Sequence, residues 1–285
     1  HFYVLNRHFH IAEIMERRRL ASAIVLNAAA FNGSRIIGPS FAGLAIALIG
    51  LGGTFLVNAV SFLAVIVSLA FIRADTPAPE THPHPITAMK EGLSYTFSRP
   101  DLRLIILVVA LISVFGWSYA AILPVIAADV FGQGASGLGY LYTAVGLGAL
   151  CATLTISFFL PRVGPAPFIL GGNVLLGLML LSFSFVSHFG VGLGLMFFIG
   201  LALLAQMSVM QSIVQHAIHD SVRGRVMSIY VTFFRGTAPF GALLIGYLGE
   251  ALGPQWAVRL MALPTLATAA IMIRKRRLLP FRLGE

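Results

Sequence analysis

Residues 31–44 read FNGSRIIGPSFAGL, and residues 231–244 read VTFFRGTAPFGALL. Each stretch places one arginine, Arg35 or Arg235, in the middle of a long apolar run. At a separation of 200 residues, the positions around the two arginines match without a gap. The matching pairs are Pro39 and Pro239, Ala42 and Ala242, Leu44 and Leu244, Leu48 and Leu248, and Gly53 and Gly253. The chain therefore carries an internal repeat, and the number of helices between its copies decides the fold.

The composition is typical of an integral membrane protein. Of the 285 residues, 58% are hydrophobic and only 10% are charged, and the mean hydropathy is +0.91. In soluble globular proteins about a quarter of the residues are charged. The single cysteine, Cys151, lies inside an apolar run, so there is no disulfide framework. We expect no cofactor and no metal site. Because the first residue is His1 and not methionine, we expect an N-terminal truncation.

Eight apolar stretches are long enough to cross a membrane, which takes about 20 helical residues. They cover residues 21–49, 53–72, 102–128, 136–160, 165–187, 190–215, 226–249 and 256–273. The sequence therefore predicts an all-α, polytopic membrane bundle of eight transmembrane helices. Between the second and third stretches, a Pro-rich segment is followed by Ile86, Met89, Leu93 and Phe97 at helical spacing. This pattern predicts a short amphipathic helix on the membrane surface.

Basic residues mark one side of the membrane. Sixteen of the 19 lysines and arginines fall in loops on the same side when loops are numbered alternately: Arg7, Arg17, Arg18, Arg19, Arg73, Lys90, Arg99, Arg103, Arg162, Arg223, Arg225, Arg274, Lys275, Arg276, Arg277 and Arg282. The other three, Arg35, Arg235 and Arg259, lie within spans. The positive-inside rule makes the basic side cytoplasmic and places both termini there. Membrane topology and attraction to anionic lipid then account for the net charge of +9. We therefore expect no nucleic-acid partner.

Six spans separate the two copies of the repeat, so both copies have the same orientation. A parallel repeat of six helices relates the two halves of one large class of transporters. We therefore expect a fragment of a twelve-helix protein. Its parts would be a cytoplasmic segment with the possible end of a preceding helix (1–19), the last two helices of the first half (20–72), a linker with the amphipathic helix (73–101), a second six-helix half (102–273) and a basic tail (274–285).

Three segments also carry a likeness to a known family. They are RLASAIVLNAAAFNGSRIIGPSFAG at 19–43, RGRVMSIY at 223–230, and a pattern formed by Ile86, Glu91, Gly92, Leu93, Tyr95 and RPDLR at 99–103. In these segments the chain resembles the major facilitator superfamily of secondary transporters. The nearest branch includes the enterobactin (siderophore) exporter and macrolide-efflux-like permeases. The resemblance begins near residue 17 and covers nearly all of the remaining chain.

The resemblance implies a bacterial inner-membrane protein that exports a small amphipathic or anionic molecule, such as a drug or siderophore, by alternating access. Gly33, Gly38, Pro39 and Gly43 resemble the family's antiporter signature, with Ala42 in place of one glycine. They imply exchange for protons, although close helix packing alone would also explain them. Arg223 and Arg225 would act at a cytoplasmic gate or anchor the topology. A monomer is expected for the full-length protein, with the lipid bilayer, the substrate and protons as partners.

Arg35 and Arg235 are the strongest candidates for function, since an arginine at a helix centre costs about 2.5–3.5 kcal/mol on insertion scales. Each would line a wet cavity and attract an anionic substrate or pair with a carboxylate, or else bind backbone carbonyls at a helix kink. Further candidates for the cavity are polar or aromatic residues within spans: Asn27, Asn32, Trp117, Tyr119, Tyr142, Gln206 and Gln211. Helix packing and helix–helix hydrogen bonds are the alternative roles for these residues.

The sequence also leaves other functions to compare with export. Uptake or facilitated diffusion would use the same fold, and the sequence shows no coupling group because no Asp or Glu lies in the middle of a span. The motif GASG at 134–137 offers Ser136 as the nucleophile of an intramembrane serine protease, but a catalytic serine needs a histidine within hydrogen-bond reach. His216 and His219 would lie at the opposite face of the membrane. No G-x-x-x-x-G-K-[ST] motif occurs, so the chain holds no P-loop ATPase.

Overall fold

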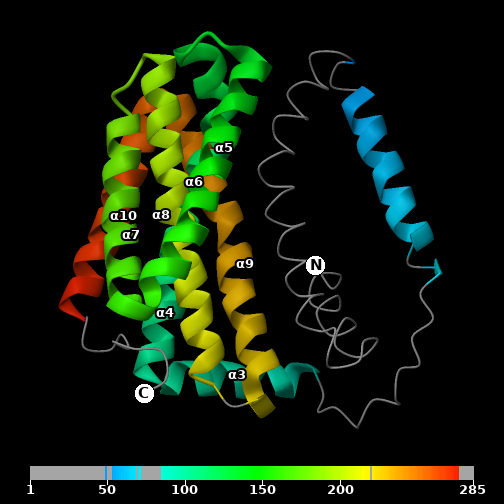
Figure 1. Ribbon diagram of the computed structural model, residues 1–285, viewed down its shortest axis with the longest axis vertical. Coiled ribbons are helices and arrows are strands. Elements are labelled where there is room, and N and C mark those ends of the chain that lie inside the picture. The colour runs from blue at the N-terminus through cyan, green and yellow to red at the C-terminus, as the bar shows by residue number, and fades with distance from the viewer. Residues whose placement is uncertain (1–48, 50–52, 69, 72–84, 219, 276–285) are drawn as a thin grey trace. The chain divides into compact units, whose positions relative to one another are not determined.

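A computed structural model describes residues 49, 53–68, 70–71, 85–218 and 220–275 of the chain. The chain separates into two compact units, residues 1–83 and residues 84–285. The described part of the first unit is mainly one apolar helix, Gly53–Ser68. The second unit is a bundle of long helices, as Figure 1 shows.

The second unit begins with α3 (Pro85–Ser98) and then crosses the bundle six times. The first crossing combines four short elements: α4 (Pro100–Leu111), η1 (Ile112–Gly116), α5 (Tyr119–Val125) and η2 (Ile126–Val130). The other five are continuous helices: α6 (Gly134–Val163), α7 (Pro165–Phe183), α8 (Phe189–His216), α9 (Asp220–Leu252) and α10 (Pro254–Arg274). The elements η1 and η2 are π-helical, and sequence periodicity did not predict them.

Six of the eight predicted spans are confirmed as apolar helices long enough to cross a membrane. Of the predicted span over 53–72, the structure describes a helix over Gly53–Ser68, and Ala70 is also helical. The predicted span over 21–49 lies outside the described residues, except for Ile49. Within the described ranges the secondary structure is helical, because a chain in hydrocarbon must satisfy its backbone hydrogen bonds internally.

Two of the sharp turns between helices combine glycine with proline. Gly164 has φ of 74° and Gly253 has φ of 91°, a left-handed conformation that side chains with a Cβ rarely adopt. Pro165 and Pro254 follow directly and begin α7 and α10. A glycine just beyond one helix and a proline at the start of the next are the preferred residues at these positions. The sequence therefore encodes both turns locally.

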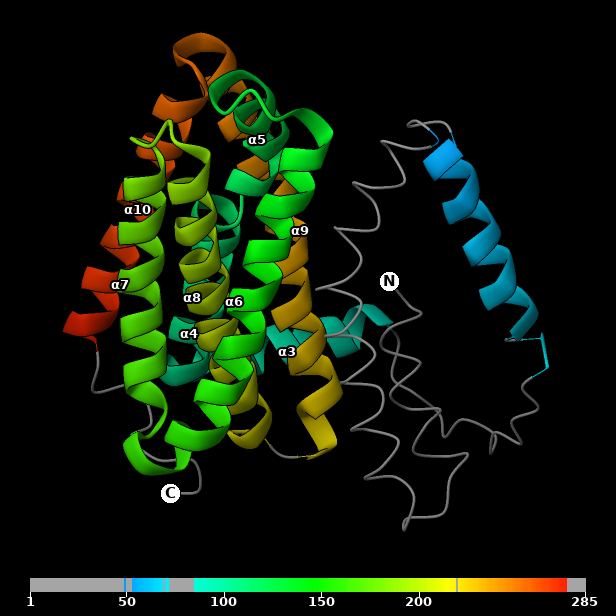
Figure 2. The same ribbon diagram turned by 45° about the horizontal axis from the view of Figure 1, so that its top comes forward.

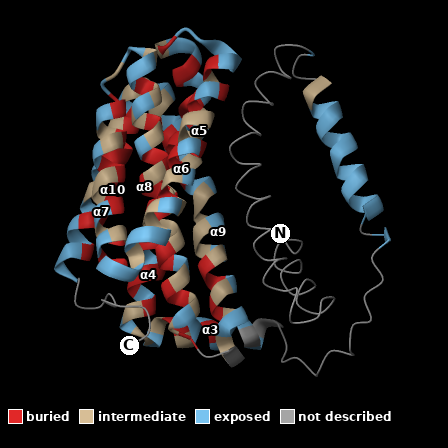
Figure 3. Cartoon of the chain, viewed as in Figure 1, coloured by how far each residue is buried: buried red, intermediate tan, exposed pale blue. Residues whose placement is uncertain are grey.

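Small residues bring the bundle helices close together. Helix α8 packs against α6 and α7, and α10 packs against α7. A Cβ added to Gly148 of α6 would lie 1.8 Å from the Phe197 carbonyl oxygen, and one added to Gly200 of α8 would lie 2.0 Å from the Val145 carbonyl oxygen. Glycine is thus required on both sides of the crossing of α6 and α8. Figure 3 shows buried residues alternating with exposed ones along these helices.

The segment predicted as an amphipathic helix forms α3. Figures 1 and 2 show α3 lying across one end of the bundle, nearly perpendicular to the long helices. It contacts α9 and α4. We call this end of the bundle the α3 end, because α4, α7 and α9 begin there and α6, α8 and α10 return to it.

Candidate functional site

Helix α9 packs closely against α4 and η1 of the first crossing, through both backbone and side-chain atoms. A Cβ on Gly241 would lie 2.3 Å from the Val114 carbonyl oxygen in η1. Thr237, one turn before Gly241, donates a hydrogen bond of 3.4 Å to the Ala110 carbonyl. The carbonyl of Phe234, two turns before Gly241, accepts a hydrogen bond from the Ser113 hydroxyl. These contacts fix the position of Phe234, and with it the position of the neighbouring Arg235.

Arg235 lies near the middle of α9 and is exposed on the surface of the six-helix unit. Its guanidinium carbon lies 5.8 Å from the centre of the Phe234 ring, within the range of a cation–π interaction. The Phe234 ring in turn meets the half-buried Trp117 edge-on, with ring centres 5.6 Å apart and an interplanar angle of 87°. A cation thus sits on an aromatic pair at mid-span, on a side chain that the bundle does not enclose.

A shallow apolar groove of about 340 Å³ lies on the same helix, between α9 and α5. Its walls are Ala121, Ile122, Val125, Ala242, Gly246 and Gly249, and Glu250 lies at its rim. Ala242 and Gly246 follow Arg235 by seven and eleven residues, and this spacing places all three on one face of a helix. One face of α9 therefore carries the Arg235 cation near the middle of the helix. The apolar groove and the Glu250 carboxylate lie on the same face, closer to the end of the helix that is opposite α3.

The other predicted cavity residues are dispersed. Tyr119 is buried, and the hydroxyl of half-buried Tyr142 donates a 3.2 Å hydrogen bond to the Ala120 carbonyl. Gln211 is exposed near the α3 end of α8. Among the predicted cavity residues, Trp117 contacts Phe234 beside Arg235. Seven of the predicted residues lie outside the described part of the chain: Asn27, Asn32, Gly33, Arg35, Gly38, Pro39 and Gly43.

Gln206 is fully buried in α8, beside Gly172 of α7. Neither its amide nitrogen nor its amide oxygen has a hydrogen-bond partner in the part of the chain that the structure describes. A nearby buried amide, Asn173, is better satisfied, since its side-chain oxygen accepts a 3.0 Å hydrogen bond from Thr268 of α10. Gln206 is therefore an energetic liability within the six-helix unit, not a group exposed to a cavity.

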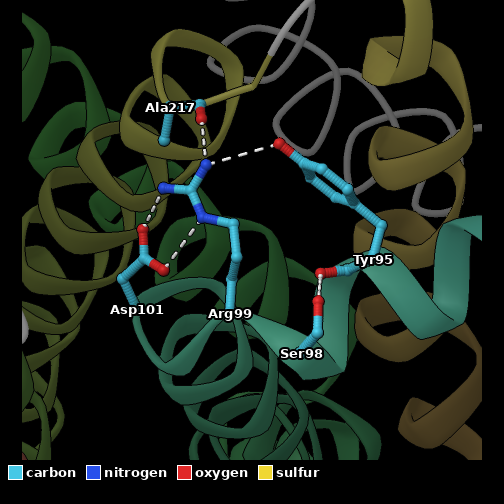
Figure 4. Close-up of polar contacts among 5 residues, drawn as sticks. All are labelled: Tyr95, Ser98, Arg99, Asp101 and Ala217. Atoms are coloured by element: carbon cyan, nitrogen blue, oxygen red, sulfur yellow. Dashed lines mark hydrogen bonds and ion pairs between the residues drawn. The ribbon is translucent and has the colours of Figure 1, made fainter.

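The α3 end contains an arginine whose role the sequence pattern did not predict. Arg99 joins α3 to α4 and binds both carboxylate oxygens of Asp101, at 3.2 Å and 2.5 Å. Figure 4 shows the same guanidinium reaching the Ala217 carbonyl, 2.6 Å away at the end of α8, and the Tyr95 hydroxyl at 3.4 Å. The hydrogen bond to Asp101 raises the pKa of Arg99 above its ordinary value; partial burial opposes this rise and Tyr95 adds to it. Arg99 is thus a permanently charged link between α3, α4 and α8.

The predicted gate arginines have different surroundings. Arg225 forms an ion pair of 2.7 Å with Glu91 of α3, and a Cβ on Gly92 would touch both Arg225 and Ile229. Arg223 is exposed. Arg225 therefore ties the start of α9 to α3.

The sequence did hold one signal that could have pointed to Arg99. This residue stands directly before Pro100 and Asp101, where a helix begins at a loop boundary.

Arg259, the other described arginine within a predicted span, has a structural role. It lies near the start of α10, between the rings of Phe185 and Trp256, whose centres are 3.8 Å and 4.2 Å from its guanidinium carbon. It donates hydrogen bonds to the hydroxyl and carbonyl of Ser184, which caps the end of α7. A cation at a helix C-terminus complements the helix dipole.

Ser136 is explained by helix geometry. It lies in the first turn of α6 and is exposed, and its hydroxyl donates a 3.2 Å hydrogen bond to the Gln133 carbonyl. A serine at the start of a helix commonly makes such a local bond.

Comparison with known proteins identifies the family. Residues 7–281 match the sequence profile of the major facilitator superfamily group described as "Transmembrane secretion effector". The chain belongs to this family. It is an integral membrane protein of a transporter family and not an enzyme, so the serine protease alternative is rejected.

The curated relatives of this member of the family include siderophore transporters. The staphyloferrin A transporter of Staphylococcus aureus is 26% identical over 281 residues, covering 96% of this chain and 69% of that protein. The enterobactin exporter EntS of Escherichia coli O1:K1 is 25% identical over 225 residues, covering 77% of this chain and 52% of that protein. EntS of Shigella boydii is 25% identical over 252 residues, covering 85% and 58%. The chain spans between about half and about two thirds of the length of these relatives.

Proposed function

We propose that the protein is a secondary transporter that exports a small anionic or amphipathic molecule of the siderophore type by alternating access, driven by the proton gradient. Membership of a family of secretion effectors supports the direction, and a relative named for enterobactin export supports the substrate type. We also propose that the α3 end is cytoplasmic, because Lys90, Arg103, Arg162 and Arg274 are exposed there.

The observation that carries this proposal is the exposed Arg235. A guanidinium facing hydrocarbon at mid-span would cost about 2.5–3.5 kcal/mol, and charged side chains within spans usually face a bundle interior or a water-filled cavity. The exposed face of α9 beside Arg235 is therefore a candidate wall of the transport pathway. The Phe234 and Trp117 rings beside the cation suit a planar substrate, because such a molecule stacks on aromatic faces while its negative charge meets the guanidinium.

The test replaces Arg235 in the full-length protein by Gln and by Lys, and measures export into everted vesicles with an imposed pH gradient. We expect Arg235→Gln to lower export at least tenfold, which corresponds to about 1.4 kcal/mol in the transport step. Arg235→Lys should retain part of the activity, because it keeps the charge but loses bidentate binding.

Arg259→Gln is the matched control for loss of an arginine within the bundle. Since Arg259 caps α7, this variant should lower thermal stability more than the export rate of the folded protein. If Arg235→Gln exports at the rate of the unmodified protein with the same pH dependence, Arg235 is a structural residue and its proposed role is wrong. If the vesicles accumulate substrate only when the pH gradient is reversed, the protein works in uptake.

A further inference from the structure

Helix α3 presents three faces with different properties. Gly92 and Thr96 are buried against the bundle. Phe97, at the end of the apolar stripe and four residues after Leu93, packs on Phe233 of α9 with ring centres 5.9 Å apart. Met89 and Leu93 are 61% and 41% exposed, and their spacing of four places them on one flank of the helix. The bundle therefore covers only one part of the apolar surface of α3.

The third face is polar. Lys90 and Ser94 follow Met89 and Leu93 by one residue each, about 100° further round the helix and away from the buried face. Both are exposed. From the bundle outward, the helix thus presents a packed face, an apolar flank and a polar face. This order suits a helix lying in the interface of a bilayer, with its apolar flank among acyl chains and its polar face toward water.

The charges around α3 favour an anionic partner. Glu91 is paired with Arg225, and Asp101 is paired with Arg99. Lys90 is exposed on α3 itself, and four more basic residues are exposed where α4 begins and where α6 and α10 end: Arg103, Arg162, Arg274 and Lys275. Each basic residue near an anionic membrane surface adds to the attraction.

We propose that α3 is a lipid-binding element whose apolar flank, Met89 and Leu93, inserts into the leaflet and whose Lys90 binds anionic phospholipid headgroups. The ion pair of Glu91 with Arg225 and the close contact at Gly92 connect this surface to the start of α9. The lipid composition of the leaflet therefore acts on the helix that carries Arg235.

The test measures where the flank lies without depending on transport. A nitroxide label is attached to Met89→Cys or, as the matched control on the polar face, to Ser94→Cys, each in full-length protein with Cys151→Ala. The proteins are reconstituted into vesicles of phosphatidylcholine alone or of phosphatidylcholine with phosphatidylglycerol at a molar ratio of about 3:1. Collisions with oxygen report lipid exposure, and collisions with a nickel chelate report water exposure.

We expect the oxygen-to-nickel collision ratio at Met89 to exceed that at Ser94 several-fold, and to rise further with phosphatidylglycerol. Lys90→Gln should abolish the rise while leaving the difference between the two sites. Equal ratios at the two sites would overturn insertion of the flank, and so would protection of Met89 from both reagents, which would indicate a covering protein surface. A ratio that does not depend on phosphatidylglycerol would overturn the anionic headgroup site.

Discussion

The crossing of α6 and α8 provides the most stringent test of the fold. A Cβ added at Gly200 would lie 2.0 Å from the Val145 carbonyl oxygen, whereas real Cβ atoms essentially never come closer than 3.0 Å to another heavy atom. The obstructing atom belongs to the backbone of α6, so no side-chain rotation relieves the clash. Gly200→Ala must therefore separate the two helices by about 1 Å, or shift one of them along the other.

The expected cost follows from this displacement. Overpacking a close interface costs about 1 to 3 kcal/mol, while alanine instead of glycine favours an isolated helix by about 1 kcal/mol. Gly194→Ala separates the two terms, because Gly194 lies on the same helix and a Cβ there would meet nothing within 4 Å. We therefore expect Gly200→Ala to be less stable than Gly194→Ala by about 1 to 3 kcal/mol.

The assay uses full-length protein purified in mild detergent and heated briefly. It measures the temperature at which half of the protein is lost from the monodisperse peak. Gly194→Ala should match or exceed the unmodified protein, and Gly200→Ala should fall several degrees below it. Gly148→Ala should behave like Gly200→Ala, and the double variant should cost less than the sum because one separation relieves both clashes. Equal stability of Gly200→Ala and Gly194→Ala would refute the close crossing.

Two further predictions concern polar groups. Gln206→Met, which keeps the shape of the side chain, should raise stability by about 1 to 3 kcal/mol because it removes a buried amide without described partners; a loss of stability would mean that the amide is satisfied in the full-length protein. Arg225→Gln and Glu91→Gln, combined in a double-mutant cycle, should give a coupling energy of about 0.2 to 1 kcal/mol that falls with salt, since the two side chains are 32% and 52% exposed. A coupling energy that does not change with salt would contradict an exposed ion pair.

The helices were predictable where a single physical requirement dominates. Apolar stretches of about 20 residues must form helices in a bilayer, and glycine or proline marks where they turn. The predicted span 165–187 is α7, which begins at Pro165, and the span 256–273 is α10, which begins at Pro254. The amphipathic stripe likewise predicted α3. The π-helical turns of the first crossing did not show in the sequence; η1 packs against α9 and α10, and η2 packs against α6.

The candidate site was predictable only in part, because contacts between distant residues decide it. The position of Arg235 in a span was evident. The edge-on contact of its neighbour Phe234 with Trp117 was not, because it depends on the close approach at Gly241. Arg99 looked like one of many basic loop residues until the end of α8 was placed beside it. Gln206 looked like a cavity residue, but α7 buries it. Periodicity indicates that a residue lies on a helix but not which neighbouring helix covers it.

The described arginines in or beside the spans show why environment matters more than residue type. Arg259 is held by two rings and two hydrogen bonds, and Arg99 by a carboxylate, a carbonyl and a hydroxyl. The contact described for Arg235 is a cation–π interaction at 5.8 Å, worth about 0.5–1 kcal/mol at an exposed site. That gain is smaller than the cost of about 2.5–3.5 kcal/mol for a mid-span arginine. Under the proposed function, the remaining stabilisation would come from outside the six-helix unit, from water and an anionic substrate in the transport pathway.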